Sequence, residues 1–168
     1  MAIINRRHKK NIGKLSVIPL GGVGEIGKNM YVLNYNDEDI IVIDSGLMFP
    51  EEDMLGIDSV IPDITYLEEN KDKIRGIILT HGHEDHIGGL PYVLRKIQAP
   101  IFATRLTLGL VEGKLKEHHL LRGIDLRCIK AGDILELGAF SVEIIRSSHS
   151  ITDTVILAID TPLGTVVH

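Results

Sequence analysis

Short apolar runs, separated by Gly, Asn and Asp, dominate the hydrophobic pattern of this chain and predict a strand-rich protein. The predicted strands cover residues 15–20, 30–35, 40–44, 76–80, 100–103, 126–129, 134–137, 140–146, 155–160 and 165–168. The first three strands follow one another through short polar connections, one of them the turn at 36–39. We therefore expect an antiparallel meander near the N-terminus.

Three other segments are predicted to form helices. Apolar positions three and four residues apart predict helices over 87–97 and 106–119, and Pro62 favours the first turn of a short helix over 62–70. Strands with helices between and outside them predict an α/β or α+β sandwich. With 168 residues and no repeat or linker, the chain fits one domain.

Composition and charge narrow the class of protein. A hydrophobic fraction of 44% and a charged fraction of 24% are ordinary for a folded domain. No apolar run reaches the roughly 18 residues of a membrane span, so we expect no membrane association. The net charge of −5 argues against nonspecific coating of nucleic acid, but it leaves a local positive site open.

Two further features carry less weight. The basic segment over residues 1–14 lacks the apolar core of a secretory signal, and we interpret it as a solvated tail rather than a segment that contacts phosphates. The single cysteine, Cys128, excludes an internal disulfide and cysteine-rich zinc modules. We expect its side chain to be a small buried hydrophobe.

The segment HGHEDH at 81–86 carries the strongest chemical signal. His81 and His83 are two residues apart, so extended backbone would direct both side chains to one side. Asp85 and His86 follow at the start of the predicted helix and would point elsewhere. Imidazoles combined with carboxylates suit Zn²⁺ or Mn²⁺, so we predict two neighbouring metal sites rather than a solvated loop.

Residues outside this segment must complete such a site. His149 lies in the small-residue loop SSHS after the strand at 140–146, and we predict that it is a ligand rather than a surface histidine. Asp44 ends a predicted strand and could form a turn, or it could accept the free N–H of a metal-bound imidazole. We favour the second role. Gly88 and Gly89 indicate a close approach by another segment.

The segment GVGEIG at 22–27 offers a competing interpretation, because it matches the dinucleotide-binding pattern G-x-G-x-x-G. That fingerprint must open a helix whose N-terminus receives the pyrophosphate. Here residues 28–35 are typical of a strand. We therefore predict a tight loop beside the metal site.

The H-x-H-x-D-H pattern after a buried strand resembles that of metallo-β-lactamase-fold hydrolases. Four blocks in order are similar to bacterial ribonuclease J of the β-CASP family: LGGVGEIGKN at 20–29, residues 44–62, THGHEDHIGGLP at 80–91 and HSITD at 149–153. The resemblance covers nearly all of the chain after residue 14. It implies that 15–168 form the N-terminal part of a metallo-β-lactamase αββα sandwich, and that the chain ends before the β-CASP domain.

The resemblance also implies a cytoplasmic location and an activity: metal-dependent endonuclease and 5′-to-3′ exonuclease cleavage of RNA, in mRNA decay and rRNA maturation. It implies two divalent ions, Zn²⁺ first, with Mn²⁺ or Mg²⁺ as alternatives. His81, His83 and His149 would hold one ion, the catalytic residues Asp85 and His86 would hold the other, and Asp44 would lie beside them.

The family's remaining ligands, a bridging aspartate and a further histidine, are expected after residue 168, as is an oligomerisation region that would pair the protein with itself or a paralogue. We therefore expect the isolated chain to be inactive. A thioester or lactone hydrolase of the same fold is the alternative, since the metal cluster alone does not separate these substrates.

Overall fold

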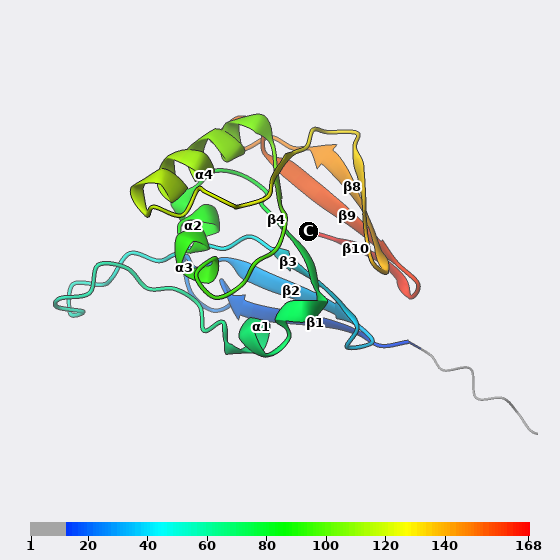
Figure 1. Cartoon of the computed structure of the whole chain (residues 1–168), viewed down its shortest axis with the longest axis horizontal. Coiled ribbons are helices and arrows are strands. Elements are labelled where there is room, and N and C mark those ends of the chain that lie inside the picture. Colours follow the sequence, from blue (N-terminus) through cyan, green and yellow to red (C-terminus); the bar gives the residue numbers. More distant parts are fainter. Residues whose placement is uncertain (1–12) are drawn as a thin grey trace, which may run out of the picture.

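The computed structural model describes residues 13–168, so most of the expected basic tail at 1–14 lies outside the described residues. Two β-sheets pack face to face, and helices cover the outer face of the first (Figure 1). The first sheet has six strands in sequence order: β1 (Leu15–Gly21), β2 (Met30–Tyr35), β3 (Asp39–Ile43), β4 (Ile74–Ile78), β5 (Ile101–Ala103) and β6 (Leu126–Cys128). The second has the order β10 (Gly164–Val167), β9 (Val155–Thr161), β8 (Phe140–Arg146) and β7 (Ile134–Leu137).

The pairing changes from antiparallel to parallel within the first sheet. Strands β1, β2 and β3 form the predicted antiparallel meander, whereas β3 to β6 run parallel. Parallel neighbours need crossover connections, and the helices occupy them. These are α1 (Thr65–Glu69) with a 3₁₀ turn at Lys71–Lys73, α2 (Glu84–Ile87), α3 (Leu90–Val93) and α4 (Arg105–Glu117).

Strand β3 shows why the layers form. Its run of isoleucine and valine is buried on both faces, as expected for a strand between two layers. Ile40 and Val42 pack toward the helices, while Ile41 and Ile43 pack toward the second sheet, since successive side chains alternate across a strand. The arrangement confirms the α/β sandwich that the sequence pattern predicted. No helix among residues 13–168 is long and apolar enough to cross a bilayer.

Three local predictions need correction. The helix expected over 87–97 is broken into α2 and α3, and the helix expected from Pro62 begins at Thr65. Cys128, expected to be buried, is exposed at the end of the edge strand β6. The break follows from competing hydrogen bonds: the Gly89 N–H donates to the Ser45 carbonyl oxygen at 2.8 Å, and the Asp85 carbonyl oxygen accepts from the Asn29 N–H at 2.9 Å, in place of a helical bond between Gly89 and Asp85. The two segments lie so close that a Cβ on Gly89 would be 2.5 Å from the carbonyl oxygen of Gly46. This close approach is the one that the glycine pair predicted.

Candidate metal centre

The candidate ligands meet at the carboxyl edge of the parallel strands. Asp44 directly follows β3, and the segment 81–86 follows β4. Loops beyond the carboxyl ends of parallel strands are the usual ligand-binding position in such sheets. The loop between β8 and β9 joins them from the second sheet, because the Val155 N–H donates to the Thr80 carbonyl oxygen at 3.1 Å. This hydrogen bond brings His149 to the segment 81–86.

Three histidines form a group that could hold a metal ion. Nitrogen atoms of His81, His83 and His149 all lie within 4.8 Å of one another. Nε2 of His81 is 3.1 Å from Nδ1 of His83, and the His149 ring centroid lies 4.8 Å and 5.0 Å from those of His81 and His83. The set of imidazole nitrogens therefore fits a divalent ion such as zinc.

The protonation state of His81 agrees with this interpretation. Burial, with the nearby His86, lowers the pKa of His81 to about 4. Its ring is therefore neutral at physiological pH, and a neutral imidazole is the form that binds metals. The Thr80 hydroxyl lies 3.0 Å from His81 Nδ1, so Nε2 is the nitrogen left facing His83.

Asp44 fixes the orientation of His86 from a fully buried position. Its carboxylate accepts hydrogen bonds from the Thr80 backbone N–H at 2.8 Å and the Thr80 hydroxyl at 2.9 Å. Oδ2 lies 2.7 Å from His86 Nδ1, which must be the donor because an ionised carboxylate only accepts. Nε2 of His86 is thereby left to face Asp85, at 3.5 Å from Oδ2.

The electrostatics of His86 differ from those of His81. Burial opposes protonation of His86, but the hydrogen bond and charge of Asp44, together with the charge of Asp85, raise its pKa above the usual value. Asp85 and His86 lie outside the group of three histidines, as a pair beside it. The remaining acidic residue of the segment, Glu84, points away and pairs with Lys114 at 2.8 Å.

Asn29 belongs to this site, although the residue pattern alone did not single it out. Its side-chain amide donates to Asp85 Oδ2 at 3.0 Å and to the Asp85 carbonyl oxygen at 3.1 Å, and it lies 3.2 Å from His86 Nε2. The only signal for it in the sequence was its place at the end of the block 20–29. The glycine-rich loop leads into β2 rather than a helix, as predicted, so it forms no dinucleotide fingerprint.

Residues 23–168 match the family model of the metallo-beta-lactamase superfamily, and the chain belongs to this superfamily. It is 49% identical to Ribonuclease J of Synechocystis sp. over 156 residues and 49% identical to Ribonuclease J of Thermus thermophilus over 161 residues, which confirms the expected resemblance. Each match covers 92% of this chain but only 24% and 28% of those relatives. The chain therefore spans about a quarter of their length.

Solved structures show the same fold at low sequence identity. A protein of unknown function from Enterococcus faecalis V583 superposes with a TM-score of 0.69 and 19% identity, covering 92% of this chain and 42% of that one. A diphosphatase of the PhnP family gives 0.62 and 20%, covering 87% of this chain and 62% of that one. At this level of sequence identity, the similarity shows only that the fold is shared.

Proposed function

We infer that this chain carries part of the dinuclear metal site of a ribonuclease that hydrolyses RNA phosphodiester bonds. The observation that carries the proposal is the convergence of three imidazoles from two sheets, in a chain about half identical to ribonuclease J relatives. Exonuclease and endonuclease action, a cytoplasmic location and assembly with a second copy or a paralogue are parts of this proposal.

Each candidate residue has a distinct role in the proposal. His81, His83 and His149 hold one divalent ion, and Asp85 with His86 provides ligands for a second. Zn²⁺ is the first choice because imidazole nitrogens dominate the donor set, with Mn²⁺ or Mg²⁺ as alternatives. When bound, the ions supply Lewis-acid charge that activates water and stabilises the negative charge developing at the phosphate.

The protein's own groups then act on orientation and protons. Asp44 keeps the proton of His86 on Nδ1, so that Nε2 presents its lone pair to the site. Asn29 holds one carboxylate oxygen of Asp85, which fixes the direction of the other. Asp85 is thereby placed to orient the attacking water as well as to bind metal.

A chimaera tests the activity. The chain replaces the matched segment of the Thermus thermophilus relative, and cleavage of labelled RNA is measured beside hydrolysis of a thioester panel. We expect RNA cleavage that falls at least 100-fold with His83→Ala and stays within twofold with His118→Ala, a histidine next to Tyr92 and outside the site. Unchanged RNA turnover in His83→Ala, or a folded chimaera that consumes only thioester, would overturn the proposal.

A further inference from the structure

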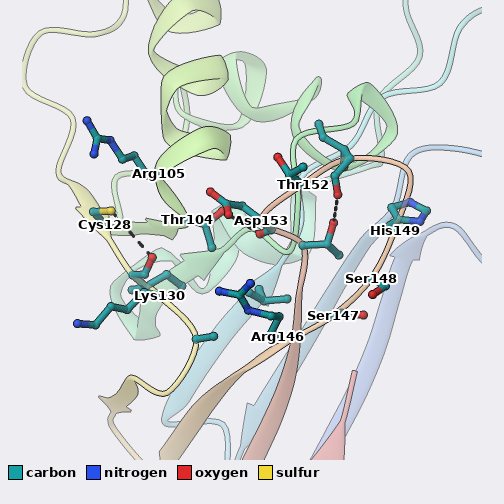
Figure 2. Close-up of a pocket in the computed structure, with 15 residues that line it drawn as sticks. Thr104, Arg105, Cys128, Lys130, Arg146, Ser147, Ser148, His149, Thr152 and Asp153 are labelled. Atoms are coloured by element: carbon teal, nitrogen blue, oxygen red, sulfur yellow. Dashed lines mark hydrogen bonds between the residues drawn. The ribbon is translucent and has the colours of Figure 1, made fainter.

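A pocket of about 550 Å³ opens beside the candidate metal centre, on the other side of the loop that carries His149 (Figure 2). Three segments line it: the junction of β5 and α4, the loop after β6, and the end of β8 with the loop 147–154. His149 belongs both to the wall of this pocket and to the group of three histidines. A ligand in the pocket would therefore lie next to the metal centre.

The pocket has an excess of positive charge in a chain that is negative overall. Arg105, Lys130 and Arg146 line it, against the single carboxylate of Asp153. None of these three cations forms an ion pair with a carboxylate of residues 13–168. Figure 2 shows Arg105 and Lys130 on the side away from His149, with Arg146 between them and the serines of the loop. All three cations therefore line the same pocket that His149 borders.

Uncharged hydrogen-bond donors also line the pocket, and these suit an anion. The hydroxyls of Ser147, Ser148 and Thr152 line it, and α4, a helix of 13 residues, begins at its wall. Thr104 precedes this helix and gives its hydroxyl to the Asp153 carbonyl oxygen at 3.0 Å, so the side chain does not cap the helix N-terminus. Free backbone N–H groups and the helix dipole add to the positive potential there.

We propose that this basic pocket binds a backbone phosphate of the RNA strand, next to the phosphate that undergoes cleavage. This inference rests on the proposed function and deepens it. Arginine matches the oxygen geometry of a phosphate, and unpaired cations lose no existing ion pair when they bind one. A lactone, or a thioester without phosphate groups, carries no chain of negative charges and would gain nothing from these cations. The pocket therefore favours a polyanionic substrate.

The test uses this chain loaded with zinc and a 3′-labelled, 5′-hydroxyl RNA oligonucleotide of about ten nucleotides, a typical single-strand site size. Because the 5′ end carries a hydroxyl group instead of a phosphate, only internal phosphates contribute to the measured affinity. The double variant Lys130→Gln/Arg146→Gln is compared with Lys116→Gln/Arg122→Gln, which removes the same charges from exposed positions outside the pocket. Fluorescence anisotropy gives the affinity over a series of salt concentrations, and zinc content is measured for every variant.

We expect the pocket variant to bind RNA at least tenfold more weakly and the control variant to stay within twofold of the unmodified chain. The slope of log affinity against log salt should become shallower by about 0.7 for each phosphate that the variant no longer binds. Equal weakening in both double variants, no weakening in either, or no RNA binding by the unmodified chain would overturn the proposal. Retained zinc in the pocket variant separates such a failure from failure of the metal site itself.

Discussion

Replacing Asp44 with asparagine would remove one buried negative charge while leaving the shape of the side chain nearly unchanged. Asp44 has a backbone φ of 61°, in the left-handed region, which asparagine also tolerates. The substitution therefore tests the charge and the hydrogen bonds rather than the backbone conformation. It reports on the link between β3, the segment after β4 and the imidazole of His86.

The expected magnitude follows from the hydrogen bonds that the carboxylate accepts. Thr80 donates from its backbone at 2.8 Å and from its hydroxyl at 2.9 Å, and His86 donates at 2.7 Å. An asparagine has one carbonyl oxygen, so its NH₂ group must face either Thr80 or His86. Hydrogen bonds to charged groups contribute about 1.5–3 kcal/mol each, so loss of one predicts about 2–3 kcal/mol less free energy of unfolding without metal.

Metal binding should weaken as well, because His86 loses the partner that keeps its proton on Nδ1. Removing such a partner typically lowers metal affinity about 10–100-fold. Urea unfolding in the presence of a chelator measures the first effect, and zinc competition against a chromophoric chelator measures the second. Asp53→Asn, at an exposed position, is the control. An Asp44→Asn chain with wild-type stability and wild-type zinc affinity would refute this reasoning.

Two further predictions follow from the same site. Gly46→Ala should disrupt zinc binding and lower the free energy of unfolding by about 3 kcal/mol or more, since the new Cβ would overlap the Asp85 carbonyl oxygen. The control Gly113→Ala, in open space on α4, should instead raise the free energy of unfolding by about 0.5–1 kcal/mol. Equal melting temperatures for the two variants would contradict both expectations. In the metal-free chain, NMR titration of histidine side chains should find His81 neutral down to about pH 4 and His86 protonated above pH 6.5. Because folding lowers the pKa of His81, the contribution of His81 to stability falls as the pH drops from 6.5 toward 4. Folding raises the pKa of His86, so His86 contributes stability that is lost as the pH rises. Identical titration of the two rings near pH 6.5 would show the site to be wrongly described.

The sequence pattern predicted most of this fold because most of its signals are local. Strand β3 is a continuous apolar run, and the strands at Ile134–Leu137 and Phe140–Arg146 have the predicted bounds. The segment 81–86 is visible in the sequence for the same reason, since its histidines and carboxylate are neighbours along the chain. Its position after a buried strand also predicted that these side chains would be held in a defined direction.

Helix ends and exposure depended on neighbours distant in the sequence. The helical spacing over 87–97 is genuine, yet the approach of the Gly46 backbone to Gly89 accompanies its division into two short helices. Cys128 has apolar neighbours in the sequence, but β6 lies at the edge of its sheet, where one side has no adjoining strand. Period and composition describe one element at a time and contain no information on such contacts.

The amino-acid sequence by itself determined which groups could bind a metal: a cluster of imidazoles and a carboxylate after β4, with His149 as a separate candidate. Only the tertiary structure decided that His149 approaches His81 and His83, and that Asn29 contacts Asp85. The physical reason differs for the two contacts. The approach of His149 depends on the packing of two sheets, which the backbone hydrogen bond from Val155 to Thr80 joins, whereas the Asn29 contact depends on a backbone hydrogen bond from Asn29 to Asp85 between loops of the first sheet. Spacing along a chain fixes the direction of neighbouring side chains, whereas distances between loops are fixed by the core that holds the loops together.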